Sequence, residues 1–334
     1  FQTQPTSGSV TERMRIDSSG NVKINGGTNY SQLQIISTGA EGGIKFVDSG
    51  GNVDGYLYAT GSSIGFLDSG TNQRFKIDDN SRISLSNNDD GNYNTVFGYG
   101  AGMPTGTNSN SNVIIGHETF DLVANDGATG NTFVGYRVAR GNPDSSTDHN
   151  VGIGYAALNA LTSGDSNVCI GSSAGVAITE EHNVIAIGRN AGAAIEDTGA
   201  DGTVAIGRDA LTALTSGIGN VAVGYQAMNA ASTSDYNTAV GYLSLSSMNG
   251  DGAAHNTGIG RAAGLLLTSG VDNTYLGSVS GYYNATGNNN TYVGKKAGHG
   301  VSGQSNSDNT GVGKDALVAI TDSNRNTAVG SGAG

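Results

Sequence analysis

The sequence is poor in the aromatic, cysteine and charged residues that usually form the core and the active site of a compact enzyme. Its 334 residues include no Trp and one Cys, and aromatic residues supply only 6% of the chain. The lone cysteine, Cys169, excludes an intrachain disulfide framework, so we interpret it as a packing residue. Charged residues reach only 13%, whereas Gly, with 55 residues, has about twice its usual share. Polarity therefore comes from Asn, Ser, Thr and Gly, a mixture typical of disorder unless a regular repeat imposes a structure.

Positive charge and long apolar segments are also scarce. The formal net charge is −12, and no run of Lys and Arg interrupts the acidic background. We therefore expect neither a nucleic acid nor an anionic membrane surface as a partner, because both require a basic stripe. No apolar run approaches the ~20 residues that span a bilayer, so no membrane insertion is predicted for this segment. Phe1 starts the chain without an initiating Met or a signal peptide, and Gly334 ends it inside a repeat, from which we expect a piece of a longer protein.

Residues 1–90 carry short strand-like runs about ten residues apart, separated by turns rich in Gly, Asn, Asp and Ser. Several runs alternate apolar and polar residues, which predicts half-buried β-strands. This strand-rich module has few large apolar residues, so a core of its own would be small. The predicted strands are residues 14–16, 21–24, 32–36, 43–47, 56–58, 64–67, 74–77 and 82–85.

Residues 91–334 form a repeat domain in which one motif, anchored by a glycine, occurs fourteen times. Thr, Val or Ile always stands three residues before the glycine, and an aliphatic residue (Phe97 in the first copy) stands one residue before it. Ala stands three residues after it in ten copies, and Asn four residues before it in twelve. The anchoring glycines are Gly98, Gly116, Gly135, Gly154, Gly171, Gly188, Gly207, Gly224, Gly241, Gly260, Gly277, Gly294, Gly313 and Gly330.

The period of two along a β-strand gives these positions a physical meaning. The residues three and one before the glycine share one strand face, which we expect to line a narrow dry core. The glycine permits a bend, or a close approach by neighbouring backbone, where a Cβ would clash. The small residue three positions later is expected to return to the same core. No single copy can bury its own face, so the copies must stack into a solenoid.

The asparagine four residues before the glycine has an expected structural role as well. Its amide can satisfy turn backbone, and asparagine tolerates left-handed backbone angles. Stacked copies would align these side chains into a ladder at the ~4.8 Å strand spacing. The clearest members are Asn220, Asn237, Asn256, Asn273 and Asn290.

The spacing between glycines leaves two coil geometries open. From Gly135 to Gly330 the spacings cycle through 19, 17 and 17, so three copies sum to 53 residues. In one interpretation each copy of 17–19 residues is a complete coil of two short strands and two turns. In the other, three copies build one triangular coil with long corners. We favour the first, in which the longer period records duplication of a three-coil block.

The motif Asn-Thr-Ala-Val-Gly-Tyr at residues 237–242, with a close copy at residues 326–333, resembles the head repeat of trimeric autotransporter adhesins. The resemblance covers about 240 of the 334 residues and implies a left-handed parallel β-roll. It also implies that three chains pack side by side and that their surface binds host matrix or cells. The copies here are a few residues longer than is usual in those heads, which leaves the binding specificity open.

Residues 11–22, Thr-Glu-Arg-Met-Arg-Ile-Asp-Ser-Ser-Gly-Asn-Val, resemble a segment that recurs in bacteriophage tail fibres. Residues 55–77 resemble those fibres too. Such fibres often carry a self-cleaving chaperone domain farther along, which is not among these residues, so trimerisation by that route is an inference. The two resemblances together favour a phage-type fibre over a bacterial surface adhesin.

No pattern in the sequence predicts a catalytic group, a cofactor or a metal. Of the five histidines, three directly precede an asparagine in expected loops. On a trimer axis three symmetry copies of such a histidine could hold a metal, but no spaced Cys, His and Asp cluster supports this, and we interpret the histidines as solvated. They are His117, His149, His182, His255 and His299.

Adjacent acidic residues are poor candidates for glycoside cleavage, which needs two opposed carboxylates. Neighbours in a strand or turn point apart, although a tailspike-type polysaccharide-degrading enzyme stays as the second alternative. The glycine-rich residues 98–102 lack the spacing of a dinucleotide-binding loop. The acidic pairs are Asp78–Asp79, Asp89–Asp90 and Glu180–Glu181.

Five tyrosines directly follow an anchoring glycine, and we expect them to be exposed and stacked. They would contact sugars or, in the interpretation we favour, pack across a chain interface. These are Tyr99, Tyr136, Tyr155, Tyr225 and Tyr242.

The sequence thus predicts an all-β protein: a parallel β-solenoid (β-roll) of ~14 coils after a small strand-rich module. The resemblances imply that it assembles as an intertwined or side-by-side homotrimer. The predicted function is a non-catalytic structural and adhesive fibre segment on a virion or cell surface. A bacteriophage tail fibre for host attachment is placed first and a bacterial trimeric adhesin head second. The expected partners are copies of the chain itself and a host or cell-surface glycan or protein, with no cofactor.

Overall fold

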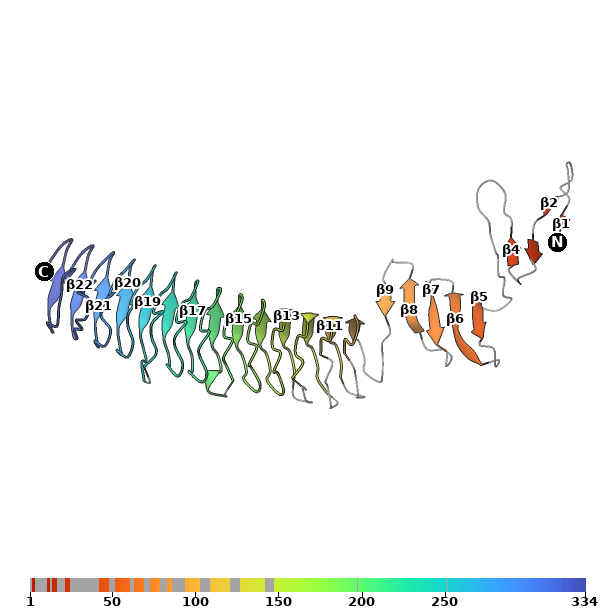
Figure 1. The fold of residues 1–334 in the computed structure, drawn as a ribbon, viewed down its shortest axis with the longest axis horizontal. Coiled ribbons are helices and arrows are strands. Elements are labelled where there is room, and N and C mark those ends of the chain that lie inside the picture. The colour runs from red at the N-terminus through yellow and green to blue at the C-terminus, as the bar shows by residue number, and fades with distance from the viewer. Residues whose placement is uncertain are drawn as a thin grey trace. The chain divides into compact units, whose positions relative to one another are not determined.

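A computed structural model describes the strands between residues 2 and 85 together with Asn52, and residues 94–334 except 103–108, 121–126, 142–146, 197 and 251. The chain divides into two compact units, Phe1–Ser86 and Asn87–Gly334 (Figure 1). Within the described residues the regular elements are β-strands, apart from one short 3-10 turn, η1 (Thr198–Ala200).

The first unit consists of antiparallel strands. Two small hairpins pair β1 (Gln2–Thr3) with β2 (Thr11–Glu12) and β3 (Met14–Ile16) with β4 (Val22–Ile24). A five-stranded meander follows, in the order β5 (Gly42–Val47), β6 (Val53–Thr60), β7 (Ser63–Asp68), β8 (Gln73–Asp78) and β9 (Ile83–Leu85). These strands confirm seven of the eight predicted runs, and the eighth, residues 32–36, lies outside the described residues.

One face of the meander carries a cross-strand row of apolar side chains. The strand register aligns Ile44 with Leu57, Leu57 with Phe66, and Phe66 with Phe75. Phe66 and Phe75 are in ring contact at 5.8 Å, yet Phe66 is 49% exposed and Ile44 is 37% exposed. The unit therefore leaves part of its apolar surface uncovered.

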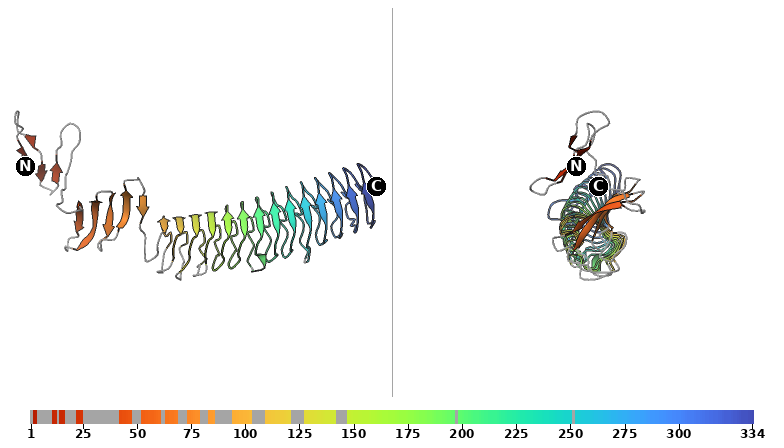
Figure 2. Two further views of the ribbon diagram at one scale, coloured as in Figure 1. Left: turned by 180° about the vertical axis from the view of Figure 1, so that it is seen from behind. Right: turned by 90° about the vertical axis from the view of Figure 1, so that its right-hand side faces the viewer.

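The second unit is a parallel β-solenoid of about 12 turns, built on one sheet of 14 strands in chain order. Successive coils lie side by side along one axis (Figure 2). The strands are β10 (Thr95–Phe97), β11 (Val113–His117), β12 (Thr132–Tyr136), β13 (Val151–Tyr155), β14 (Val168–Ile170), β15 (Ile185–Ile187), β16 (Val204–Ile206), β17 (Val221–Val223), β18 (Thr238–Val240), β19 (Thr257–Ile259), β20 (Thr274–Leu276), β21 (Thr291–Val293), β22 (Thr310–Val312) and β23 (Thr327–Val329).

Each copy of the motif forms one complete coil, which confirms the first of the two geometries. The register pairs every strand with the next copy, as in Val221 with Thr238 and Val223 with Val240. Equivalent glycines are therefore adjacent, and a Cβ on Gly224 would overlap the carbonyl oxygen of Gly241. The predicted close approach of neighbouring backbone at the anchoring glycines is confirmed.

The prediction of two strands per coil is wrong, because only one side of each coil forms a strand. On the other side, every second residue has left-handed backbone, with φ of 51° at Gln226 and 50° at Met228. The ladder continues nevertheless, since the Gln226 N–H donates to Arg208 in the preceding coil and the Met228 N–H donates to Ser244 in the following coil. Alternating backbone handedness thus keeps the hydrogen bonds between coils without extended geometry.

The core-facing strand position also differs from the prediction. Burial shows that the residue two before the glycine points inward, as at the fully buried Ala222 and Cys169, while the residues three and one before it are half-buried or exposed. The residue three positions after the glycine does return to the core, as at Ala227. A period of two establishes which residues share a face, but it does not say which face is inside.

The asparagine ladder is confirmed. Asn237 donates its backbone N–H to Oδ1 of Asn220 at 3.0 Å and its side-chain amide to the carbonyl of Ala253 at 3.1 Å, and its own Oδ1 accepts the N–H of Asn256 at 2.9 Å. The side chains are fully buried, so each amide replaces the water that turn backbone would otherwise need. Val184 and Thr203 interrupt the ladder where the motif lacks Asn.

Candidate functional site

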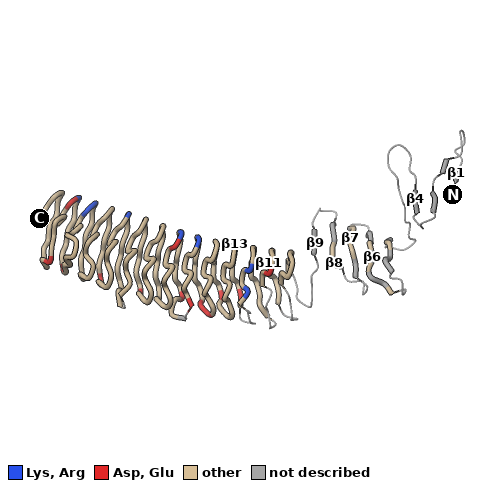
Figure 3. Tube along the Cα trace, viewed as in Figure 1, with Lys and Arg blue, Asp and Glu red and all other residues tan. Residues whose placement is uncertain are grey.

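The outward side of the sheet is the first surface that could take part in binding. We call it the outer sheet face: the side chains three and one before each anchoring glycine. None of the fourteen strands contains Lys, Arg, Asp or Glu, and Figure 3 shows charge confined to the turns of the solenoid. Ile153, Ile259 and Leu276 are 36%, 37% and 43% exposed. The outer sheet face is therefore a long, uncharged, partly apolar strip.

The composition of the outer sheet face changes along the solenoid. From β13 to β17 the residue three before the glycine is Val or Ile, and from β18 to β23 it is always Thr. The residue one before the glycine stays aliphatic throughout these strands. The strip therefore runs from purely apolar to alternating hydroxyl and aliphatic side chains.

A second surface lies at the corner just after the strand. We call it the corner column: the residues that directly follow the anchoring glycines, one per coil. Apart from Ser and one His, it contains only Tyr, Arg and Lys, and no acidic residue. Its members are Tyr99, His117, Tyr136, Tyr155, Ser172, Arg189, Arg208, Tyr225, Tyr242, Arg261, Ser278, Lys295, Lys314 and Ser331.

The aromatic members of the corner column stack along the solenoid. His117 lies between Tyr99 and Tyr136, with ring centroids 5.3 Å apart on both sides, and Tyr136 stacks on Tyr155 at 5.2 Å. Tyr225 and Tyr242 form a second stack, also at 5.2 Å. The sequence-predicted stacking is thus present. Tyr99, Tyr155 and Tyr242 are exposed, and Tyr136 and Tyr225 are half-buried.

Cations lie against these rings. The Arg137 guanidinium is 5.1 Å from the Tyr136 ring centre and donates from Nε to Glu118 at 2.7 Å. This hydrogen bond lowers the pKa of Glu118. The Arg208 guanidinium carbon similarly lies 5.7 Å from the Tyr225 ring centre, and its Nε lies 3.1 Å from Oδ2 of Asp209. Arg208 is a member of the corner column and Arg137 directly follows one, so cations, each paired with a carboxylate, meet aromatic rings at this corner.

Acidic residues gather on the opposite side of the coil, six residues before the glycine. There a side chain accepts the backbone N–H of the preceding coil, as when Asp165 accepts from Asp148 at 2.7 Å and Asp201 accepts from His182 at 2.7 Å. Figure 3 shows Lys and Arg mostly along one edge of the solenoid and Asp and Glu mostly along the other. The two edges thus differ in charge.

The histidines are dispersed. Asp165 donates its N–H to Nδ1 of His182 at 3.0 Å, His255 stacks on Tyr236, and His299 stacks on Tyr282. Among the described residues no group of three or more His, Cys, Asp or Glu side chains is placed to hold a metal ion.

The acidic pairs do not form opposed carboxylates where the structure describes them. Glu180 is exposed, while Glu181 is buried and accepts the N–H groups of Thr179 and Glu180 through Oε2. Its Oε1 has no hydrogen-bond partner, and burial raises the pKa of the carboxyl group. Of the other pairs only Asp78 is described, as the last residue of β8, and Asp79, Asp89 and Asp90 lie outside the described residues.

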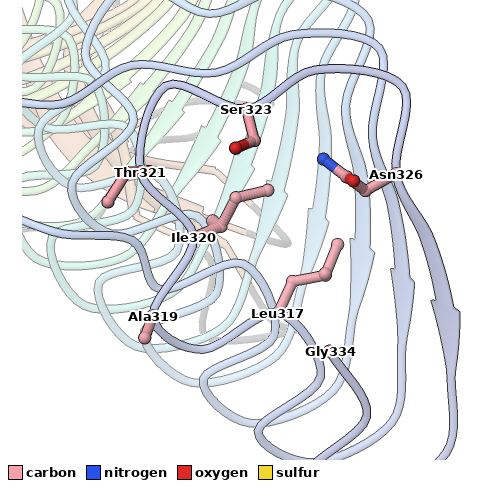
Figure 4. A pocket seen from close by; sticks show the side chains of 7 residues that line it. All are labelled: Leu317, Ala319, Ile320, Thr321, Ser323, Asn326 and Gly334. Carbon is pink, nitrogen blue, oxygen red and sulfur yellow. The ribbon is translucent and has the colours of Figure 1, made fainter.

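A recess of about 370 Å³ lies at the last coil of the solenoid (Figure 4). Leu317 and Ile320, which point into it, occupy positions that carry core residues in earlier coils. In earlier coils the equivalent core positions are covered by the next coil, so the recess is exposed solenoid core. It is lined by Leu317, Ala319, Ile320, Thr321, Ser323, Asn326 and Gly334.

Sequence reasoning found the tyrosines of the corner column but missed its cations. Arg189 and Arg208 are 19 residues apart in the chain, and Arg208 and Arg261 are 53 apart, so no basic run is visible. Their shared position after a glycine was the signal that could have revealed them. Once the coils stack, five cations lie along one edge although the chain has no basic run.

Comparison with known proteins found no matching family model, no matching curated protein and no matching solved structure. Within the described residues, no helix has the length and apolarity needed to cross a membrane. The outer sheet face and the corner column are the two surfaces of this β-solenoid that could take part in binding.

Proposed function

We propose that this chain is a non-catalytic, structural and adhesive segment of a trimeric surface fibre, most consistent with a bacteriophage tail fibre for host attachment. The observation that carries the proposal is the outer sheet face, a strip without charge along the whole solenoid. The sequence resemblances support the fibre identity. They also supply the alternative, a bacterial trimeric adhesin head.

The outer sheet face supports self-association because it offers apolar side chains to water on every coil. Soluble monomers rarely expose contiguous apolar patches beyond a few hundred Å². Two half-exposed aliphatic or β-branched side chains per coil, repeated over fourteen strands, form such a patch. Packing three copies face to face would remove it from water without burying any charge. The apolar row on the meander would be covered in the same way.

Light scattering after size-exclusion chromatography tests the assembly. We expect the mass of a trimer for the wild type. Replacing Ile206 and Val223 on the outer sheet face with Lys should give monomers, since six charges would enter the interface. Ser172→Lys, at an exposed corner-column position, is the control and should leave the trimer intact. A monomeric wild type would exclude the trimeric fibre.

Adhesion needs a separate measurement. Labelled protein should bind intact cells from a panel of bacterial strains in at least one case. That binding should be saturable and should be lost in the monomeric variant. The complete reading frame distinguishes the two identities: a chaperone or virion-attachment segment supports the phage fibre, and a secretion signal with a membrane anchor supports the adhesin. A trimer that binds no cell surface would reduce the proposal to a purely structural filament.

A further inference from the structure

We propose that the corner column is the binding site for a linear acidic polysaccharide, a glycan that bears carboxylate or sulfate groups at regular intervals. This inference rests on the proposed adhesive function and names the chemistry of its ligand.

The cations of the column are aligned and accessible. Arg189 and Arg208 follow one another in adjacent coils, as do Lys295 and Lys314, with Arg261 between the two pairs. All five are exposed. Within the described residues no acidic side chain pairs with Arg189, Arg261 or Lys295. These three groups are therefore free to bind an anion. Arg261 lies four coils beyond Arg189 and Lys295 two coils beyond Arg261, with ~4.8 Å between neighbouring coils.

The column repels no anion through acidic members of its own, because none of its fourteen positions is Asp or Glu. Three acidic residues do directly follow column members: Glu118, Asp209 and Asp315. They pair with Arg137, Arg208 and Lys314, which offsets their charge. Further acidic side chains lie on the other edge, in the ladder that includes Asp165 and Asp201. Although the chain has a net charge of −12, it thus presents one cationic edge to a ligand.

The tyrosines favour a sugar polymer over a simple anion. Tyr225 and Tyr242 stand between Arg208 and Arg261, and their rings stack at 5.2 Å. Tyr242 is 50% exposed. Ring edges and phenol hydroxyls offer the combined apolar and polar contacts that a pyranose ring can use. A linear glycan repeats its sugar units along one axis, as the corner column repeats its side chains from coil to coil, so the two can make several equivalent contacts.

The charge density of the column disfavours nucleic acid. Duplex DNA carries one negative charge per about 1.7 Å of its axis. The column offers at most one cation per coil, about one per 4.8 Å, and its Ser and Tyr positions lower that density further. Widely spaced carboxylates or sulfates on a glycan are the better match.

The test uses isothermal titration calorimetry of the full chain with four probes: polygalacturonate, dextran sulfate, unmodified dextran and duplex DNA. Arg189, Arg208 and Arg261 are replaced together by Ser, the residue that the column itself carries at Ser172 and Ser278. The matched single substitutions are Arg261→Ser, in the column, and Arg325→Ser, an exposed cation on the other edge at a position where Ser166 stands in another coil.

The wild type should bind polygalacturonate or dextran sulfate, more weakly as salt is added, and should not bind dextran. The triple variant should lose about tenfold in affinity, since each exposed ion pair contributes modestly. Arg261→Ser should lose about threefold and Arg325→Ser almost nothing. Replacing Tyr225 and Tyr242 with Ser should weaken glycan binding while its salt dependence is retained.

Equal affinity of the triple variant and the wild type would overturn the assignment, as would equal losses for Arg261→Ser and Arg325→Ser. DNA binding as tight as glycan binding would overturn the polysaccharide part. Cell binding separates this inference from the proposed function. If the triple variant stays trimeric and adheres to cells as the wild type does, the column is not the site while the fibre proposal stands. If the wild type binds the acidic glycan but no cells, the adhesive function fails and the binding chemistry stands.

Discussion

Two stretches of the solenoid fill the same coil interior in different ways. In the coil of β16 the interior is aliphatic, with Ala205, Leu211 and Leu214 all fully buried. In the coil of β20 the strand position is Tyr275, and the positions of the two leucines carry Gly281 and Asn284. The ring occupies the leucine space, since a Cβ on Gly281 would lie 2.6 Å from the Tyr275 ring. Core volume is thus conserved within a coil while its chemistry changes.

The polar groups of the tyrosine coils are satisfied inside the core. Asn284 donates to the Tyr275 hydroxyl at 3.2 Å, and the Tyr292 hydroxyl donates to Oδ1 of Asn306 at 2.5 Å. Burial raises the pKa of both phenols, so they stay protonated. The two rings stack at 5.8 Å. Both stretches share the anchoring glycine and the strand register. The hydrogen bonds and close approaches of the backbone therefore define the coil, and different sets of core side chains can fill it.

Breaking the shared backbone contact should have the largest effect. Gly260 has φ of 133°, and a Cβ there would lie 2.6 Å from the carbonyl oxygen of Gly277. Gly260→Ala should therefore lower the free energy of unfolding by at least about 3 kcal/mol, measured by urea denaturation. Gly202 also has positive φ, but no atom lies within 4 Å of its added Cβ. Gly202→Ala should cost about 1–2 kcal/mol, and equal losses would show that close approach is irrelevant.

Exchanging one interior for the other is the next test. Tyr275→Ala should cost about 3–5 kcal/mol in free energy of unfolding, because it leaves a cavity beside Gly281. Adding Gly281→Leu and Asn284→Leu recreates the aliphatic pattern of Ala205, Leu211 and Leu214, and should recover more than half of that loss. If the triple variant is no more stable than Tyr275→Ala, the two interiors are not interchangeable.

Removing one rung of the asparagine ladder should cost less. Asn237→Ala deletes the acceptor of the Asn256 N–H and an amide bonded to Ala253, so the free energy of unfolding should fall by about 2–3 kcal/mol. Asn249 is exposed and serves as the control, where substitution by Ala should change the stability by less than about 0.5 kcal/mol. Thermal denaturation that gave similar shifts for both variants would contradict a specific role of the ladder.

The smallest effect concerns a coil in which Glu181 stands where Gly164 and Gly217 stand in other coils. Because burial raises the folded pKa of Glu181, the unfolded state releases its proton first, and stability falls as pH rises above the unfolded pKa of about 4.3. Glu181→Gln should thus be more stable than the wild type by about 1 kcal/mol at neutral pH, with the difference vanishing at lower pH. Exposed Glu180→Gln should show no such pH dependence in paired unfolding curves.

Several parts of this structure could be predicted because the residue types at fixed motif positions indicate them directly. The need for glycine at Gly224, the ladder at Asn237 and the one-coil copy all follow from spacing and from what each side chain can do. The absence of a second strand could not be predicted, because Gln226 and Met228 are residue types that give no local signal of left-handed backbone. Their φ values come from the ladder that both neighbouring coils impose.

The sequence by itself determined the coil, its stacking period and the residues that form its backbone contacts, because these depend on interactions that recur at fixed chain separations. The tertiary structure alone decided which strand face is dry and which residues meet at the corner. The direction in which the chain turns after each strand puts Ala222 inside and leaves Val223 outside, and the motif alone does not specify that direction. Only stacking brings Arg189 and Arg208 from distant chain positions into one column.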